Sequence, residues 1–244
     1  MKMRWVHFLR LVLLVLILLT ATGVQSGHAV TTWVVNSLGD SPGGGICTLG
    51  DCTLRSAINA AASGDTITFA PSVMGTIHLN FGGLTIAKNL TIRGPGAYVL
   101  TVAGVTDDTS VFTVNTGFSL KLSGLSITYG RNLSGGGILI FHGGTLTLDQ
   151  CSFFDNYSEE DGAVLYNHGT VTITRCYFGD NHAGTAGAGY GGAIENNEDG
   201  VMSITNSTFT LNGANGGGGA IDNMGASRSP TAPSRTMVRS LRAG

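Results

Sequence analysis

The most regular feature of the chain is a short pattern of alternating apolar and polar residues. It reads TLTLDQCSFFDN at residues 145–156 and TVTITRCYFGDN at residues 170–181, and a third copy, VMSITNSTFTLN, occupies residues 201–212. In each copy the apolar residues take every second position, shift phase once and then resume, which is the periodicity of β-strands. Each copy therefore predicts two short strands joined by a bend.

A second alternating element lies between these copies. It reads GGIL at residues 136–139, GAVLYN at 162–167, GGAIEN at 191–196 and GGAIDN at 218–223. A unit of about 25 residues that recurs in this way is typical of a solenoid, in which each turn is too small to bury its own apolar side.

Aligned copies place like residues at like positions. In a parallel β-solenoid successive turns lie about 4.8 Å apart, so repeated residues form ladders. Phe153, Phe178 and Phe209 are predicted to stack, with about 1.5–3 kcal/mol of burial free energy for each ring. The asparagines of the same copies, at 156, 181 and 212, are predicted to form an amide ladder at a corner.

Further short runs upstream extend the pattern. They are broken by Pro and Gly and predict strands at residues 66–69, 76–79, 84–86, 90–92, 98–102, 111–114 and 120–127. We therefore expect an all-β fold, a right-handed parallel β-helix of the pectate lyase-like kind, over residues 66–225 with about six turns.

Residues 30–65 are predicted to form a small cap with a short helix. Asp51 or Thr53 can cap the helix, and Leu54, Ala57, Ile58 and Ala61 have helical spacing. A helix before the first strands would cover the exposed end of the solenoid, whose backbone groups are otherwise unpaired.

The two ends of the chain differ from its body. Residues 1–29 have a basic start, an apolar run and a Gly27-His28-Ala29 cleavage candidate, which predict a signal peptide; an uncleaved membrane anchor is the alternative. Residues 226–244 contain four Arg and no acid and are predicted to be disordered.

The abrupt end of the repeats suggests a further hypothesis about the tail. A shift of the reading frame by one base can turn the SRTMVR of residues 234–239 into the repeat-like IADNGA. We hypothesise that the tail is a frameshifted continuation, which the gene sequence tests, and that the open solenoid end would then favour self-association.

Composition and charge agree with a folded, exported β-rod. Gly contributes 38 of 244 residues, only 11% are charged and 42% are hydrophobic, which favours a turn-rich β protein over a disordered one. Residues 1–29 carry +3 and residues 226–244 carry +4, which leaves −9 for the body of a chain with net charge −2. An acidic body argues against nucleic acid as a partner.

The four cysteines suggest one disulfide and one buried pair. Export permits disulfides, and Cys47 and Cys52 bracket a short loop, so we expect them to pair. Cys151 and Cys176 hold equivalent positions in adjacent turns, where they can bond or fill space as buried thiols; we favour packing. The spacing of the four does not suggest a metal site.

Asp155 and Asp180 are the strongest candidates for chemistry. They are predicted to lie one turn apart, at the separation of a retaining glycosidase pair. Pectate lyase-like enzymes build Ca²⁺ and acid/base sites from stacked acids with a nearby cation such as Arg175. The alternative is an Asp-Asn turn ladder, which we favour because the third copy has Leu211 in the same place.

Three weaker motifs have simpler interpretations. Gly187–Gly192 matches GxGxxG but lies between strands, so no dinucleotide cofactor is predicted. His142 and His168 coincide between turns, but no third ligand recurs with them, so they are predicted to be exposed turn residues rather than a metal site. The acidic loop at residues 159–161 is predicted to be solvated rather than a Ca²⁺ site. We therefore assign no catalytic, cofactor-binding or metal-binding residue.

Two stretches carry family resemblances. Cys52-Thr53-Leu54-Arg55, Ala57-Ile58 and the GDTITF run at residues 64–69 resemble the N-terminal domain of CSLREA-type secreted bacterial proteins, with Ser56 where that motif usually has Glu. The GGAI element and the Phe/Asn element over residues 135–223 resemble the repeats of polymorphic outer membrane proteins.

These resemblances imply a secreted or outer membrane-associated bacterial surface protein with a right-handed β-helix and an adhesin-like role. We therefore expect a noncatalytic protein that binds glycans or surface proteins. The alternative is a polysaccharide lyase or glycoside hydrolase of the pectate lyase-like superfamily.

Overall fold

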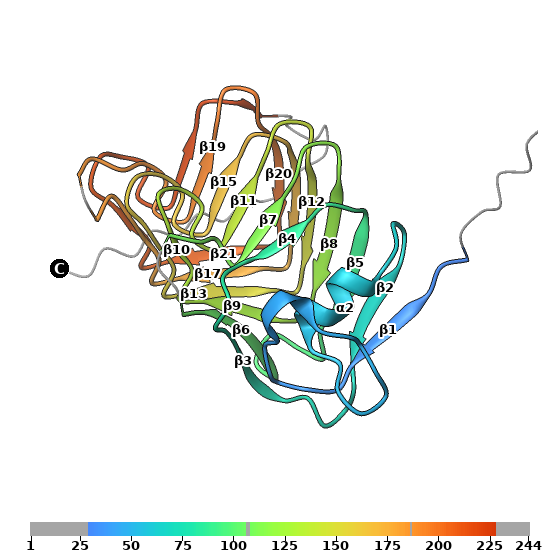
Figure 1. The fold of residues 1–244 in the computed structure, drawn as a ribbon. Coiled ribbons are helices and arrows are strands. Elements are labelled where there is room, and N and C mark those ends of the chain that lie inside the picture. Colours follow the sequence, from blue (N-terminus) through green and yellow to red (C-terminus); the bar gives the residue numbers. More distant parts are fainter. Residues whose placement is uncertain (1–28, 106–107, 186, 228–244) are drawn as a thin grey trace, which may run out of the picture.

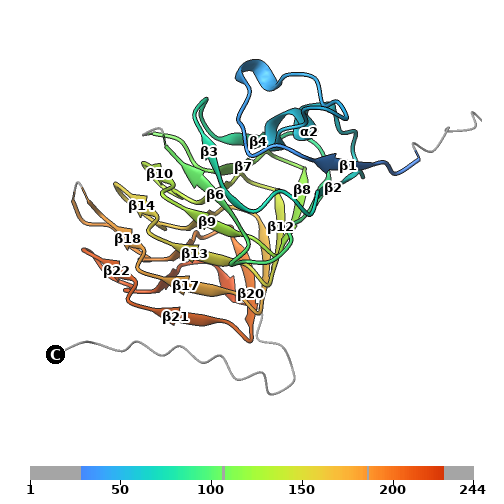
Figure 2. The same ribbon diagram turned by 90° about the horizontal axis from the view of Figure 1, so that it is seen from below.

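The chain folds into a parallel β-solenoid, seen along its axis in Figure 1 and from the side in Figure 2. The computed structural model describes residues 29–105, 108–185 and 187–227. Each turn passes through three sheets in the order A, B, C, and from β10 onward also through a short fourth sheet, D, between B and C.

Sheet A has eight strands: β1 (Thr32–Val35), β2 (Thr66–Phe69), β5 (Leu90–Arg93), β8 (Ser119–Ser123), β12 (Thr145–Asp149), β16 (Thr170–Thr174), β20 (Val201–Thr205) and β24 (Ala226–Ser227). Sheet B has six: β3 (Gly75–Leu79), β6 (Leu100–Gly104), β9 (Ser126–Thr128), β13 (Ser152–Phe154), β17 (Tyr177–Gly179) and β21 (Thr208–Thr210).

Sheet C also has six strands: β4 (Leu84–Ile86), β7 (Phe112–Val114), β11 (Ile138–Ile140), β15 (Leu165–Asn167), β19 (Ile194–Asn196) and β23 (Ile221–Asn223). Sheet D has four: β10 (Arg131–Asn132), β14 (Tyr157–Ser158), β18 (His182–Ala183) and β22 (Gly213–Ala214). The remaining elements are the 3₁₀ turn η1 (Pro42–Gly44) and the helix α2 (Leu54–Ala60).

The predicted register is confirmed. Leu146 pairs with Val171 and Val171 with Met202 in sheet A, and Phe153 pairs with Phe178 and Phe178 with Phe209 in sheet B. The inward-facing apolar residues of successive turns are buried, and some of those of the last turn, such as Met202 and Ile204, are partly buried against them, so the interior is one continuous core. About six stacked turns result, as the period predicted.

Both predicted ladders form inside this core. The ring centroids of Phe153 and Phe178 lie 4.8 Å apart, and those of Phe178 and Phe209 lie 4.5 Å apart, with nearly parallel planes. Asn156 donates its side-chain amide to Asn181 at 3.0 Å, and Asn181 donates to Asn212 at 2.8 Å. The stack supplies apolar burial, while the amides satisfy backbone groups at the corner.

Strand boundaries differ from the predictions where the chain bends. The run predicted at residues 120–127 is divided into β8 and β9, because Gly124 has a positive φ of 62° and turns the chain from sheet A into sheet B. The strand predicted at 98–102 begins later, at Leu100, and Tyr98 is exposed.

Sheet A also begins one strand earlier than predicted. β1 pairs with β2 in parallel, from Thr32 opposite Thr66 to Val35 opposite Phe69. Val35 is fully buried, so the strand contributes to the core. At the other end β24 pairs with β20, two residues beyond the predicted boundary at 225.

Candidate functional site

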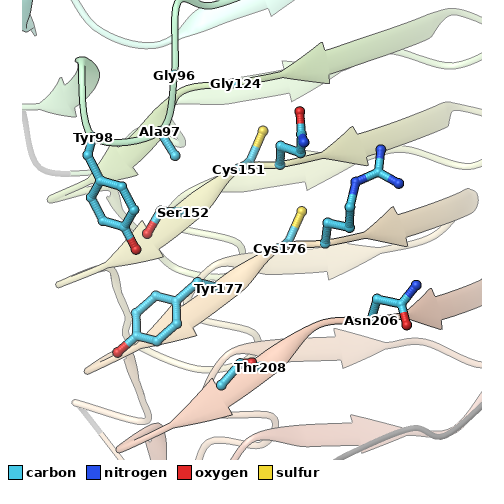
Figure 3. Close-up of a pocket in the computed structure, with 12 residues that line it drawn as sticks. Gly96, Ala97, Tyr98, Gly124, Cys151, Ser152, Cys176, Tyr177, Asn206 and Thr208 are labelled. Atoms are coloured by element: carbon cyan, nitrogen blue, oxygen red, sulfur yellow. The ribbon is translucent and has the colours of Figure 1, made fainter.

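A groove open to solvent runs along the corner where sheet A turns into sheet B, with a volume of about 490 Å³ (Figure 3). It crosses several turns of the solenoid, because its lining comes from equivalent positions of successive repeats. The lining residues are Gly96, Ala97, Tyr98, Gly124, Gln150, Cys151, Ser152, Arg175, Cys176, Tyr177, Asn206 and Thr208.

Two tyrosines form one side of the groove. Tyr98 and Tyr177 lie near each other at one end of the corner strands in Figure 3, away from Asn206. Tyr98 is 87% exposed, so its ring is available to a ligand. Burial raises the pKa of Tyr177, which keeps its hydroxyl a neutral hydrogen-bond donor.

Hydrogen-bonding side chains occupy the corner itself. Gln150, Arg175 and Asn206 hold the same place in three successive turns, each with a left-handed φ of 51–53°, and all three are exposed. This backbone conformation turns the chain sharply from sheet A into sheet B and directs the side chains outward. The sequence repeat therefore produces a ladder of two amides and a guanidinium.

The groove is close to electrically neutral. The Nη2 of Arg175 lies 2.6 Å from the carboxylate of Asp149, which is the last residue of β12, so the charges compensate. No carboxylate is among the residues that line the groove. Aromatic faces beside neutral hydrogen-bonding groups can bind a polyhydroxylated ligand, but this lining offers no acid/base pair.

Asp155 and Asp180 occupy a sharp turn and are not among the residues that line this groove. Both have a left-handed φ, 54° and 56°, at the corner that leaves sheet B, and Tyr129 and Leu211 hold the same corner in other turns. Asp and Asn tolerate this conformation better than most residues. The left-handed backbone conformation is therefore sufficient to explain why Asp occurs at this position, which favours the turn-ladder interpretation.

Another pair of acids, which we did not single out from the sequence, lies on the outward side of sheet C. Glu195 of β19 is directly opposite Asp222 of β23. Glu195 is 0% exposed, and neither of its carboxyl oxygens has a hydrogen-bond partner among the described residues. Burial raises the pKa of Glu195 to about 7, and the negative charges of Asp222 and Asp161 add to this effect.

A recurring position could have revealed this pair. The fifth residue of GAVLYN, GGAIEN and GGAIDN points outward from sheet C and is Tyr166, Glu195 or Asp222. The same copies end in an asparagine, and these form a second amide ladder: Asn167 donates to Asn196 at 2.6 Å, and Asn196 donates to Asn223 at 2.7 Å.

The two stacked histidines share an acidic partner. The Nδ1 atoms of His142 and His168 each lie 2.9 Å from an oxygen of Asp199, which comes from the turn between β19 and β20. Hydrogen bonds from His142 and then His168 lower the pKa of Asp199. Asp199 does not recur in the repeat, so the period gave no signal for it.

The remaining candidates do not assemble into a ligand site. Among the described residues no group of three or more His, Cys, Asp or Glu side chains has metal-binding geometry. The GxGxxG segment is followed by β19 rather than by a helix. In the acidic loop, Asp161 accepts a hydrogen bond from the backbone N–H of Tyr190 at 2.9 Å, which fixes a neighbouring loop.

The CSLREA-like residues build the cap. Thr53 is the N-cap of α2 and accepts a hydrogen bond from the Ser56 backbone N–H at 3.1 Å, while the two hydroxyls lie 2.8 Å apart. Ser56 thus takes the place that Glu has in a capping box. Arg55 contacts Asp40 at 2.6 Å and the carbonyl of Gly83 at 2.9 Å, which ties the cap to the first turn.

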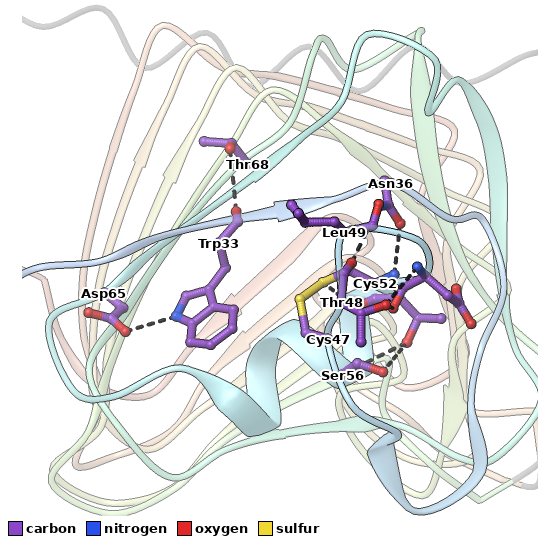
Figure 4. The surroundings of a disulfide bond; sticks show 11 residues. Trp33, Asn36, Cys47, Thr48, Leu49, Cys52, Ser56, Asp65 and Thr68 are labelled. Carbon is purple, nitrogen blue, oxygen red and sulfur yellow. Dashed lines mark hydrogen bonds between the residues drawn. A yellow bond between two sulfur atoms is a disulfide. The ribbon is translucent and has the colours of Figure 1, made fainter.

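Figure 4 shows the disulfide and the tryptophan of this cap. Cys47 and Cys52 form the predicted disulfide. Asp65 accepts hydrogen bonds from the Trp33 indole at 2.9 Å and from the Thr31 and Ala62 backbones at 2.8 and 2.9 Å. These contacts link β1 to the end of α2 and explain why sheet A begins at β1.

Comparison with known proteins identifies a family. Residues 34–232 match the family described as "Right handed beta helix region", which covers most of the chain and agrees with the predicted handedness of the solenoid. The comparison with curated proteins finds no match. Within the described residues, no helix has the length and apolar character needed to span a bilayer.

Proposed function

This chain belongs to the right-handed β-helix family, and we propose that it is a noncatalytic secreted or cell-surface protein of adhesin type that binds glycans. The groove between sheets A and B is the observation that carries the proposal. Secretion, and an association with a bacterial outer membrane, are parts of the proposal that rest on the sequence alone.

The chemistry of the groove favours a neutral glycan over a protein or an anionic polymer. Tyr98 offers an exposed ring face, while Gln150, Asn206 and Thr208 offer neutral donors and acceptors. Arg175 is paired with Asp149, so it supplies hydrogen bonds with little net charge. Sugar hydroxyls match these groups, and the apolar face of a pyranose ring can pack on tyrosine.

The spacing of the groove favours a linear ligand. Equivalent residues of successive turns lie about 4.8 Å apart along the solenoid axis. A polymer whose units repeat on a similar scale can present the same hydroxyl pattern to each turn. Because the strands are fixed by continuous parallel pairing, little ordering is required on binding.

Isothermal titration with neutral linear hexasaccharides of β-linked glucose, mannose and xylose tests this proposal. Tyr98→Ala and Tyr177→Ala are each expected to weaken binding by about five- to tenfold, which corresponds to about 1–1.4 kcal/mol of ring contact. Tyr190→Ala is the matched control, because Tyr190 is 45% exposed but lies outside the groove. Absence of binding across the panel, or an equal loss in the control, would contradict the proposal.

The second candidate is a polysaccharide lyase or glycoside hydrolase, and the Glu195–Asp222 pair is the observation that favours it. A buried carboxyl whose pKa is raised to about 7, directly opposite a second carboxyl group, resembles the acid/base arrangement of such enzymes. Glu195 is fully buried, however, so a substrate could reach it only if the structure around it opened. We rank this candidate second for that reason.

Product release separates the two candidates. An enzyme would release reducing ends or unsaturated sugars from a polysaccharide panel that includes polyuronides, and Glu195→Gln would abolish that release. The proposed binding protein would release neither, and Glu195→Gln would leave its affinity for the hexasaccharides unchanged, because Glu195 does not line the groove.

A further inference from the structure

We propose that Cys151 and Cys176 are a redox-active pair that thiol–disulfide exchange converts into a disulfide between neighbouring turns of the solenoid. This inference is independent of the glycan-binding proposal. Both cysteines are free and buried in the present structure.

Strand register places the two residues beside each other. Cys151 immediately precedes Ser152, and Cys176 immediately precedes Tyr177, which are register partners in β13 and β17. In-register neighbours of a parallel sheet lie about 4.8 Å apart, which is within the Cα separation of about 4.4–6.8 Å that disulfides span. Figure 3 shows the two side chains one above the other, with their sulfur atoms directed the same way.

Each thiol has a defined set of contacts. The Sγ of Cys151 donates to the carbonyls of Leu122 at 3.6 Å and Asp149 at 3.4 Å, and the Sγ of Cys176 donates to the carbonyl of Thr174 at 3.3 Å. Each thiol is the largest cause of the other's pKa shift, which agrees with their adjacent positions in the ladder. Strand register, which sets the separation of the two Cα atoms, is the observation that makes a disulfide between them geometrically feasible.

The pair is isolated within its ladder. The next turn has Ser207 in the same place, and the preceding turn has Leu125, so the ladder contains no third thiol. The other two cysteines are already paired with each other. Oxidation at this position therefore has a single intramolecular product.

Small reactants can reach the pair through the groove. Both cysteines line it, although Cys151 is only 2% exposed and Cys176 only 3%. The pKa of Cys176 is lowered by its interaction with Cys151. The pKa of Cys151 is raised by its interaction with Cys176 and by burial. Because the thiolate is the nucleophile in exchange, these directions favour attack by Cys176 and resolution by Cys151, and register alone allows either order.

The exchange balances with a small-molecule disulfide as oxidant. The Cys176 thiolate, its proton lost to solvent, attacks one sulfur of the oxidant, breaks the oxidant's S–S bond and releases one small thiolate. Cys151 then loses its proton and attacks the Cys176 sulfur, which forms the inter-turn disulfide and expels the second small thiolate. The two protein thiols are oxidised, and the oxidant is reduced to two thiols that take up the two protons.

Oxidation with glutathione disulfide tests the proposal on the full chain. The protein, reduced and then dialysed, is incubated with glutathione disulfide, denatured, and treated with an alkylating reagent before mass spectrometry. We expect the alkylation of Cys151 and Cys176 to be lost and a peptide pair linked through these residues to appear. Reoxidation of Cys47–Cys52 in the same sample is the internal control.

Single serine variants trap the mixed disulfide. Ser207 occupies the equivalent place in the next turn, where its hydroxyl donates to the Thr205 carbonyl at 2.9 Å, so serine is a matched replacement. Each variant should accumulate a glutathione adduct on its remaining cysteine, because the resolving thiol is absent, and acid quenching of the parent chain early in the reaction should show the adduct on Cys176 rather than on Cys151.

Circular dichroism spectra that match the parent chain show that both variants are folded. The proposal is overturned if Cys151 and Cys176 stay alkylatable after Cys47–Cys52 has reoxidised, or if either of them is linked to Cys47 or Cys52 instead. Faster adduct formation on Cys151 than on Cys176 overturns the assignment of the nucleophile.

Discussion

Removal of one rung from the asparagine ladder should destabilise the solenoid far more than the loss of one exposed amide. Asn181 is 1% exposed and lies between Asn156 and Asn212. Its side-chain oxygen accepts from the backbone and side-chain nitrogens of Asn156, both at 3.0 Å. Its amide donates to the carbonyls of Phe153 at 3.1 Å and Gly179 at 3.0 Å and to Asn212 at 2.8 Å.

The Asn181→Ala replacement therefore leaves several buried groups short of a partner. The Asn156 backbone N–H loses this acceptor, and the carbonyls of Phe153 and Gly179 lose a donor. A buried group without a partner costs about 1–3 kcal/mol, so one or two such groups lower the free energy of unfolding by about 2–5 kcal/mol. Asn212→Ala should cost less, about 1–2 kcal/mol, because Asn212 is only half-buried and ends the ladder.

Urea denaturation followed by circular dichroism measures both effects. The slope of the free energy of unfolding against urea concentration must also be compared between each variant and the parent chain, because solenoids can unfold in parts. Asn181→Asp keeps the shape of the side chain and its acceptor oxygen but replaces its donors with a second carboxyl oxygen, so it should also be destabilising. Loss of less than about 1 kcal/mol in Asn181→Ala, or equal losses at 181 and 212, would refute the reasoning.

Three further changes test other parts of the architecture. Phe178→Ala removes the central ring of the stack and should lower the free energy of unfolding by about 3–5 kcal/mol, measured by urea denaturation. A loss below about 1 kcal/mol would show that the stack contributes little to stability. Gly136→Ala should prevent folding or destabilise the protein severely, because a Cβ there would lie 2.1 Å from the Tyr157 carbonyl oxygen. Gly117→Ala has open space around the new Cβ but a φ of 77°, so it should lower the free energy of unfolding by only about 1 kcal/mol. Similar melting temperatures for the two variants would contradict the close-packing argument. The raised pKa of Glu195 means that the folded state holds this proton more tightly than the unfolded state. The free energy of unfolding should therefore be highest below about pH 4.5 and should fall as pH rises toward 7, by at most about 3 kcal/mol. Glu195→Gln should flatten that pH dependence of stability, and an unchanged slope would show that Glu195 is not its source.

The repeat alone was sufficient to predict the fold and the inner ladders. Identical spacing within the copies forces Phe153 above Phe178 and Asn156 above Asn181 in any parallel solenoid, because a strand that slipped by one residue would expose its apolar side. The capped helix was likewise predictable, since Thr53 and the apolar spacing that follows it are local signals.

The outward-facing surface could be predicted only in part. Gln150, Arg175 and Asn206 share a corner position, but their chemistry differs, and the repeated Cys151 and Cys176 were expected to pack rather than to line a groove. Tyr98 enters the groove from an irregular segment between β5 and β6 that has no counterpart in the repeat.

The amino-acid sequence by itself determined which residues form the core. When turns stack in register, only one alignment of the repeats buries all the apolar positions on the same side of the strands. Only the tertiary structure decided which polar side chains meet outside that core. Asp199 meets His142 and His168 across turns that are separated by loops of unequal length. Loop length and path depend on packing against neighbouring turns, and the period of the sequence does not encode them.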